Sequence, residues 1–255
     1  MRLQDSAAVV TGAARGIGES IALRLAEEGA DVVPVDVLDG VHGTADEINE
    51  MDEASARAVQ ADISDETEVE AMADIVTEEY GQVDILVNNA GIRKYGPITE
   101  ASEESWDDII GVNLKGYAFC SKHLIPLMAE TDGGSIVNVS SIHAEVGRPG
   151  MAQYDATKGA IVALTRAMAA DHGDQDIRVN AMLPGPVMTD FHVEERGMDP
   201  AKKEPYEGGP GIMERWADPS EISDGVLFLA SDASSFMTGR ELLVDGGLGF
   251  EFDIA

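Results

Sequence analysis

The stretch Thr11-Gly12-Ala13-Ala14-Arg15-Gly16-Ile17-Gly18 decides the fold, because it joins a short apolar run to a helical pattern. The run before it, residues 7–10, reads as a strand, and Ile17, Ile21 and Leu25 after it share one helical face. Glycines at such a turn allow the backbone to approach a phosphate, and the amino end of the helix offers N–H groups and a positive dipole. The glycine spacing is G-x-x-x-G-x-G. The stretch therefore predicts a nucleotide site at a strand-to-helix turn.

Short apolar runs alternate with longer helical patterns along the rest of the chain. The runs predict further strands at residues 31–35, 56–60, 84–87, 135–139, 179–183 and 242–244. The helical patterns cover residues 17–28, 64–80 with Ser64 as the cap, 102–128, 154–172 and 219–229. Strands that are apolar throughout are buried on both faces, as in a parallel sheet covered by helices. We expect an α/β fold with one doubly wound parallel sheet, formed by residues 1–255 as a single domain.

One segment, residues 189–216, interrupts the alternation. It carries several glycines and prolines among charged residues, with neither a strand nor a helix pattern. A loop of this length in a compact domain is usually functional. We expect it to be a lid over the substrate.

The composition of the 255-residue chain excludes several classes of protein. It has 17 Lys and Arg against 48 Asp and Glu, a net charge of −31. Such a surface repels phosphates and anionic lipid headgroups, which argues against nucleic-acid and membrane partners. Cys120 is the single cysteine, so no internal disulfide can form, and we expect a cytoplasmic protein. The five histidines show no metal-ligand spacing, and we expect no metal site.

Asp36 supports the nucleotide interpretation and suggests which cofactor binds. It ends the second predicted strand, eighteen residues after Gly18, where a carboxylate can accept hydrogen bonds from both hydroxyls of an adenosine ribose. The same carboxylate would repel the 2′-phosphate of NADP. Arg15 acts in the opposite direction, because its guanidinium could pair with that phosphate. The strongly negative chain favours NAD, with NADP as the alternative.

A second group of residues predicts chemistry. Tyr154 and Lys158 are four residues apart in a helical pattern, so their side chains share one face. Ser141 lies thirteen residues before Tyr154, just beyond the predicted strand 135–139. Ligands of open α/β sheets bind at that edge. The three side chains are therefore expected to meet at the carboxyl edge of the sheet.

These residues together resemble the short-chain dehydrogenase/reductase family, and the resemblance covers nearly the whole chain. The family's ordered motifs are matched by 11–18, Asp62-Ile63, Asn88-Asn89-Ala90-Gly91, Asn113, Ser141, Tyr154 with Lys158, and Pro184-Gly185-Pro186-Val187-Met188-Thr189. The resemblance implies a Rossmann-type fold and hydride transfer between a nicotinamide and a carbinol or carbonyl carbon. The implied cofactor-binding residues are Gly12, Arg15, Gly16, Ile17, Gly18, Asp36, Asp62, Ile63, Asn89, Ala90, Gly91, Tyr154, Lys158, Pro184, Gly185, Val187 and Thr189.

The resemblance also implies a role for each catalytic residue. Tyr154 would be the acid/base and would act as a phenolate when an alcohol is oxidised. Lowering a reference tyrosine pKa of about 10 by about three units requires roughly 4 kcal/mol, which one nearby cation such as Lys158 can supply. Ser141 would hydrogen-bond the substrate oxygen, and Asn113 would anchor a water chain that carries the proton past Lys158.

The sequence indicates the substrate less clearly than it indicates the cofactor and the reaction. Arg93 follows the Asn88–Gly91 motif, and His143 follows Ser141 in a position similar to that in bacterial glucose dehydrogenases of the family. With Ser141 and Tyr154 they form the predicted substrate site, which suits a sugar, sugar acid or polyol. A 3-oxoacyl-[acyl-carrier-protein] reductase, which favours NADPH, is the alternative enzyme. A non-catalytic dinucleotide sensor with the same fold is the alternative of another class.

The resemblance further implies a homotetramer in which the helices 112–128 and 154–172 pair across a two-fold axis. Small residues along the second helix would allow close approach: Ala156, Ala160, Ala163, Ala167 and Ala170. The net charge of −31 also suggests a halophile that keeps molar salt in its cytoplasm.

The acidity leads to a prediction about salt. Surface carboxylates repel over about 30 Å at 0.01 M salt and over about 3 Å at 1 M, while hydrophobic burial is undiminished. We expect the midpoint of thermal unfolding to rise substantially between millimolar and molar KCl. A flat midpoint across the KCl series would show that the acidity has another cause.

Overall fold

The computed structural model describes residues 1–52, 54–131, 133–189 and 209–250. Within these residues seven parallel strands form one sheet in the order β3-β2-β1-β4-β5-β6-β7. The strands are β1 (Ala7–Thr11), β2 (Asp31–Asp36), β3 (Val59–Gln60), β4 (Ile85–Asn88), β5 (Gly134–Val139), β6 (Ile177–Pro184) and β7 (Glu241–Val244). The chain winds outward in both directions from β1 and β4, so the crevice for a ligand lies at their carboxyl ends. This confirms the predicted doubly wound sheet.

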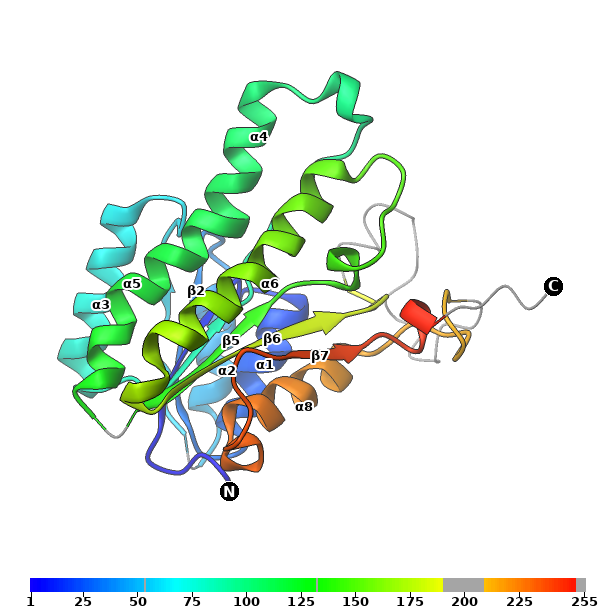
Figure 1. Ribbon diagram of the computed structural model, residues 1–255. Helices are drawn as coiled ribbons and strands as arrows, with labels where there is room; N and C mark the ends of the chain where they lie inside the picture. The colour runs from blue at the N-terminus through cyan, green and yellow to red at the C-terminus, as the bar shows by residue number, and fades with distance from the viewer. Residues whose placement is uncertain (53, 132, 190–208, 251–255) are drawn as a thin grey trace.

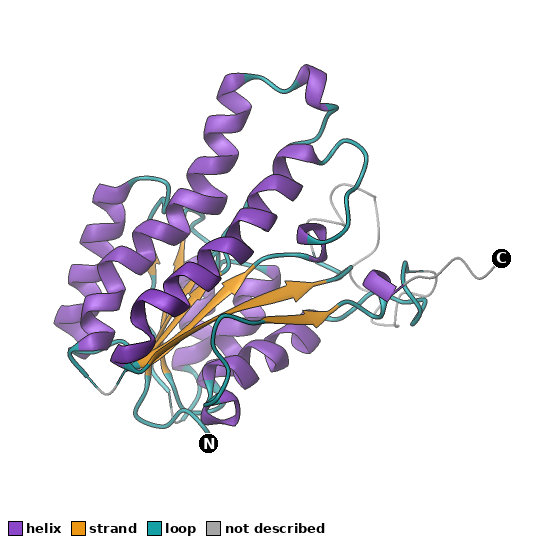
Figure 2. Ribbon diagram, in the orientation of Figure 1, coloured by secondary structure: helices purple, strands orange, loops and turns teal. Residues whose placement is uncertain are grey.

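Helices cover both faces of the sheet (Figures 1 and 2). One layer contains α3 (Glu66–Tyr80), α5 (Tyr117–Ala129) and α6 (Ala152–His172). The opposite layer contains α1 (Gly16–Ala26), α2 (Val41–Asn49) and α8 (Pro219–Ala230). The helix α4 (Glu103–Ile110) leads into α5 and extends beyond the sheet in Figure 1. The molecule therefore has three layers, with the sheet in the middle.

The core follows from the alternation of side chains along each buried strand. In β1, Val9 faces the layer of α3, α5 and α6, while Ala8 and Val10 face the layer of α1 and α8. The neighbouring strand β4 alternates in the same way: Leu86 faces the layer of α3, α5 and α6, and Val87 faces the layer of α1 and α8. Both faces are apolar, as the uninterrupted apolar runs predicted.

The structure corrects the predicted elements at the β3 side of the sheet. The helix α2 was not predicted, although Val41, Thr44, Ala45 and Ile48 form its buried stripe at helical spacing. The predicted strand 56–60 shortens to β3, because Ala56 makes only an isolated bridge to β2. The strand β3 lies at the edge of the sheet and pairs only with β2, over two residues.

Two helix boundaries also differ from the prediction. The N-cap of α3 is Asp65, whose carboxylate accepts a hydrogen bond from Thr67 N at 2.8 Å, and Ser64 precedes it. The predicted helix 102–128 does begin after the cap Ser102, but a π-helical turn, Gly111–Gly116, separates α4 from α5. A π turn inside a helix often accompanies a functional residue.

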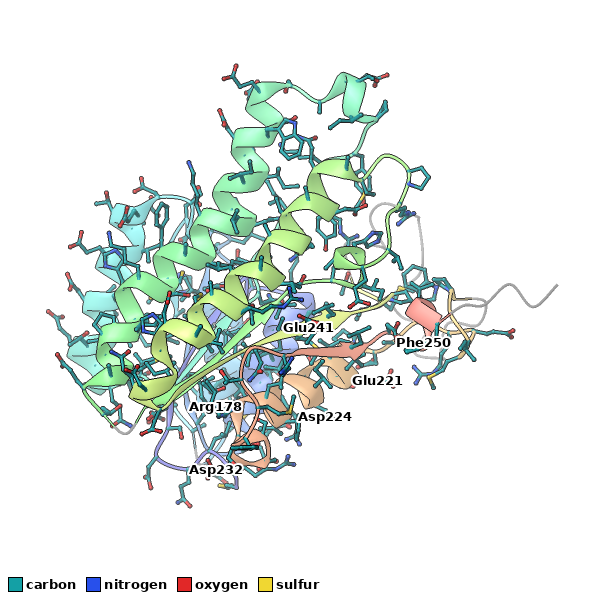
Figure 3. All side chains as sticks on the ribbon, viewed as in Figure 1. Arg178, Glu221, Asp224, Asp232, Glu241 and Phe250 are labelled. Atoms are coloured by element: carbon teal, nitrogen blue, oxygen red, sulfur yellow. The ribbon has the colours of Figure 1, made fainter. Side chains whose placement is uncertain are left out.

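The helix α8 is held at both ends. Asp218 and Glu221 form a capping box at its amino end. At its carboxyl end the guanidinium of Arg178, which projects from β6, donates hydrogen bonds to the carbonyls of Leu229 in the last turn and of the C-cap Ser231 (Figure 3). Burial lowers the pKa of Arg178. A cation among the last carbonyls of a helix satisfies groups that otherwise lack partners.

The predicted lid, residues 189–216, lies largely outside the described residues, which resume at Gly209. The described part packs on the turn after β7, where Met213 N donates to Gly246 O at 3.0 Å. Ala217 forms a parallel bridge with Val187. No helix among the described residues is long and apolar enough to cross a membrane.

Candidate functional site

A cavity of about 630 Å³ lies at the carboxyl edge of the sheet, above the crevice between β1 and β4. It brings together every predicted cofactor residue, from Gly12 in the first turn to Thr189 after β6. Of the predicted catalytic and substrate residues, Ser141, Tyr154, Lys158 and Arg93 also line it. The predicted glycine turn and three of the four predicted catalytic residues therefore face one continuous space, and Asn113 does not line it.

The glycine turn presents bare backbone to this cavity. A Cβ at Gly12 would lie 2.7 Å from Ala90 Cα, and a Cβ at Gly18 would lie 2.0 Å from Gly12 O. Gly16 has a φ of +65°, and a Cβ there would point toward Thr189 at the cavity wall. The first and last glycines are thus required by packing, and the middle one by backbone conformation.

Thr11 and Asn89 tie the ends of β1 and β4 together. Thr11 Oγ1 accepts hydrogen bonds from Asn89 N at 3.0 Å and Ala90 N at 3.2 Å. In return, Asn89 Nδ2 donates to Thr11 O at 3.0 Å and Gly12 O at 3.2 Å. These bonds hold the glycine turn against the loop after β4.

Asp36 ends β2 beside the glycine turn. Its two carboxylate oxygens accept hydrogen bonds from Ala14 N and Leu38 N, both at 3.0 Å. Asp62 lies at the same end of the cavity, where its carboxylate accepts from Ser64 N and Ser64 Oγ. Bare glycine backbone, a helix amino end and a carboxylate on the next strand are the elements that a dinucleotide needs. The residues present fit NAD or NADP.

At the other end of the cavity, Tyr154 and Lys158 lie one turn apart on α6. Lys158 Nζ is 5.5 Å from the centroid of the Tyr154 ring. Nζ donates a hydrogen bond to Val139 O at 2.9 Å, and the hydroxyl of Tyr117 donates to the same carbonyl at 3.1 Å. Tyr117 is fully buried and was not predicted. The carbonyl at the end of β5 thus positions the ammonium beneath the tyrosine.

Lys158 is 4% exposed, which changes its chemistry. Burial, with a smaller contribution from the nearby charge of Arg93, lowers the pKa of Lys158 to about 7. Removing an ammonium from water disfavours its charged form. In this state of the protein, Lys158 therefore titrates near neutral pH.

Asn113 lies in the π turn between α4 and α5 and is fully buried. Its Oδ1 accepts a hydrogen bond from Ile92 N at 2.8 Å, and its Nδ2 donates to Ile92 O at 3.0 Å and Thr157 Oγ1 at 3.1 Å. The side chain thus joins the loop after β4 to α6. These hydrogen bonds of the Asn113 amide all go to protein groups. The predicted role of Asn113, to anchor a water chain, therefore stays a prediction.

Ser141 and His143 lie in the turn after β5. Ser141 Oγ accepts a hydrogen bond from His143 N at 3.2 Å. The His143 ring meets Tyr154 edge-on at 5.8 Å, and its Nδ1 is 3.0 Å from Asp155 Oδ1. Burial lowers the pKa of His143, although Asp155 opposes this. His143 does not line the cavity but packs against Tyr154, and its role in binding the substrate stays a prediction.

Arg93 lines the cavity and lies over Tyr154, with its Cζ 5.4 Å from the ring centroid. Burial lowers the pKa of the guanidinium, but the charge and hydroxyl of Tyr154 and the hydroxyl of Tyr95 act in the opposite direction, and the pKa is raised overall. Arg93 is therefore a permanent cation at the catalytic end.

Sequence reasoning missed the apolar part of the wall and the buried supports. Ile92, Val112, Val139, Val37 and Leu38 line the cavity, the last two as exposed residues after β2. Such residues have no motif. Only the positions of Val37, Leu38 and Val139 at or just after strand ends could have suggested some of them.

Comparison with known proteins agrees with the class that fold and site define, a dinucleotide-dependent oxidoreductase. The family model described as Enoyl-(Acyl carrier protein) reductase matches residues 12–249. The chain belongs to the short-chain dehydrogenase/reductase family, whose enzymes interconvert CH–OH and carbonyl groups with NAD or NADP.

Relatives of this chain are named for different activities. The chain is 38% identical over 246 residues to the 3-oxoacyl-[acyl-carrier-protein] reductase FabG of Staphylococcus epidermidis, covering 96% of this chain and 99% of the relative. It is 38% identical over 248 residues to the meso-2,3-butanediol dehydrogenase of Serratia marcescens, covering 97% and 96%.

Two solved structures share the fold along nearly the whole chain. Levodione reductase matches with a TM-score of 0.89 and 31% identity, covering 98% of this chain and 100% of that one. The aldohexose dehydrogenase of Thermoplasma acidophilum, in ligand-free form, matches with a TM-score of 0.87 and 36% identity, covering 99% and 97%.

The buried Lys158 leads to a prediction about stability and pH. Its pKa is about 7 in the folded protein and about 10.4 in an unfolded chain, so the unfolded state binds more protons between these values. The free energy of unfolding should therefore rise by about 2 kcal/mol between pH 7 and 9. Above pH 9 the buried Cys120, whose pKa is raised to about 12, acts in the opposite direction.

Urea unfolding of the protein without cofactor, measured in molar KCl at several pH values, tests this. The Lys158→Met variant should lose most of the rise, because it removes the titrating group and keeps an unbranched side chain. An equal rise in the variant and the native protein would contradict the assignment.

Proposed function

We propose that the protein is an NAD-dependent dehydrogenase of a sugar, sugar acid or polyol. The observation that carries the proposal is the single cavity that joins the glycine turn and Asp36 to Ser141, Tyr154 and Lys158. The glycine turn at residues 12–18 holds the phosphates, and Asp36 accepts from the adenosine ribose. The remaining predicted cofactor residues form the wall between these ends.

The nicotinamide, when bound, supplies the hydride acceptor for oxidation of the alcohol. Tyr154, as a phenolate, takes the hydroxyl proton of the substrate while the C–H hydrogen leaves as hydride and the carbonyl forms. Ser141 donates a hydrogen bond to the substrate oxygen. Lys158 stabilises the phenolate with its charge, and Asn113 holds the loop of Ile92 against α6. Reduction of a carbonyl uses the same groups in reverse.

The catalytic assignment is tested at Tyr154. Tyr154→Phe removes the acid/base and little packing, so turnover should fall about 10³-fold or more while NAD binding is largely retained. Lys158→Met should damage both, because the ammonium would also hold the ribose of the bound cofactor. Turnover with a panel of aldoses, sugar acids and secondary alcohols, and NAD binding by fluorescence, provide the two measurements. Near-native turnover by Tyr154→Phe would refute the assignment.

Asp36 supports NAD over NADP, because its carboxylate lies at the end of β2 beside the turn. A 2′-phosphate there would meet a like charge, so the native enzyme should have the higher kcat/KM with NAD. Asp36→Asn keeps the shape of the side chain and should reduce this preference about 10- to 100-fold, since like-charge contacts cost several kcal/mol. A native preference for NADP would show that Arg15 decides the cofactor.

A second candidate is a 3-oxoacyl-[acyl-carrier-protein] reductase, which the FabG relatives favour by sequence. Asp36 counts against it if that activity requires NADPH. The two candidates differ in the substrate that supports turnover, an acyl thioester or a polyol. A non-catalytic sensor would turn over neither.

We also propose a homotetramer. Ala156, Ala163, Ala167 and Ala170 form an exposed stripe of small side chains along α6, which permits close approach of a second copy. Light scattering in molar KCl should give a mass near four times 27.0 kDa. A monomeric mass would exclude the assembly.

A further inference from the structure

The cations around the cavity differ in what they can reach. Among the described residues, the Lys and Arg side chains that line it are Arg15, Arg93 and Lys158. Arg15 belongs to the glycine turn, at the dinucleotide end. Lys158 is almost fully buried and donates to Val139 O. Arg93 is therefore the described cation that faces the space beside Tyr154.

The backbone at Arg93 is held by the interior of the protein. The preceding residue, Ile92, exchanges two hydrogen bonds with the Asn113 side chain, at 2.8 and 3.0 Å. Asn113 in turn donates to Thr157, on the same helix as Tyr154. The loop that carries the guanidinium and the helix that carries the tyrosine are thus fixed relative to each other.

The guanidinium contacts the residue that would exchange the proton. Its Cζ lies 5.4 Å from the Tyr154 ring centroid, and the hydroxyls of Tyr154 and Tyr95 act to raise the pKa of the guanidinium. A guanidinium has five N–H donors in one plane and matches a carboxylate with two parallel hydrogen bonds. It is thus suited to hold the tyrosine and an anionic group of the substrate side by side.

We infer that Arg93 binds a carboxylate of the substrate, which is a hydroxy acid or oxo acid with that carboxylate one or two carbons from the reacting carbon. The spacing follows because the guanidinium lies over the Tyr154 ring, with its Cζ 5.4 Å from the centroid, and the reacting oxygen must meet the hydroxyl of the same ring. A chain with a net charge of −31 repels anions, so a pocket cation is needed to hold one. The inference rests on the proposed function and narrows its range of substrates to acids.

Matched pairs of acid and neutral substrates test the inference. We would measure kcat/KM with NAD, at fixed molar KCl, for 2-hydroxybutyrate, 3-hydroxybutyrate and gluconate. Their neutral counterparts are the two methyl hydroxybutyrates and glucitol. The native enzyme should prefer at least one acid over its neutral counterpart. In Arg93→Gln this acid-to-neutral ratio should fall about 30-fold, mainly through KM, because charge-assisted hydrogen bonds are lost.

A dead-end ligand gives a second measurement that does not depend on catalysis of the acid. Butyrate has the carboxylate but no hydroxyl, and it should inhibit oxidation of the neutral substrate competitively, whereas butyramide should not. Arg93→Gln should raise the inhibition constant of butyrate about 30-fold. This readout separates carboxylate binding from any effect of Arg93 on Tyr154.

Lys94→Gln is the matched control. Lys94 is the next residue along the loop and pairs with Asp108 at 2.8 Å, so the variant removes one positive charge without touching Tyr154. It should change the acid-to-neutral ratio and butyrate inhibition less than twofold. An equal effect of the two variants would show that the loss of any positive charge in this loop weakens binding of the acid, and would overturn the inference.

The remaining outcomes separate the inference from the proposed function. Turnover of neutral alcohols without preference for any acid, and without inhibition by butyrate, would overturn the inference alone. Equal losses on acid and neutral substrates in Arg93→Gln, with butyrate inhibition unchanged, would also overturn it. Absence of NAD-linked turnover with every alcohol in the panel would overturn the proposed function.

Discussion

The contact between the ends of β1 and β4 is the constraint on which the rest of the site depends. The strand order reverses there: β1 and β4 pair, but the helices that follow them, α1 and α5, lie on opposite faces of the sheet and leave a crevice between them. The Thr11 and Asn89 hydrogen bonds hold the crevice at one width. Because Ala90 Cα would lie 2.7 Å from a Cβ at position 12, only glycine permits this approach. The cavity for the dinucleotide is a consequence of that close packing.

The catalytic end depends on polar groups that are buried but paired. The carbonyl of Val139, at the end of β5, accepts from both Lys158 and Tyr117. Asn113 satisfies both backbone groups of Ile92 and reaches Thr157 on α6. A buried polar group without a partner would destabilise the fold, so these bonds define one arrangement of the loop after β4, the π turn and α6. Burial also lowers the pKa of Lys158.

Two side chains from loops surround Tyr154. A guanidinium lies over the ring, and an imidazole held near Asp155 meets its edge. Both come from segments that follow strand ends, where loops can change without disturbing the sheet. The relatives are named for a 3-oxoacyl reductase, a butanediol dehydrogenase and an aldohexose dehydrogenase, and the chain shares its fold with the last of these. The proposed binding of an acid by Arg93 assigns substrate specificity to these loops and not to the sheet.

The sequence by itself determined the layered α/β fold, the strand positions within a few residues and the glycine turn with its partner residues. These are local features, because periodicity, caps and glycine spacing act over a few residues. It did not reveal α2, the short β3 or the π turn, since edge pairing and helix irregularity are settled by neighbours distant in the chain. It predicted both Arg93 and His143 as residues of the substrate site. Only the tertiary structure separated them, because which side chain faces the cavity depends on how the turn after β5 packs against α6.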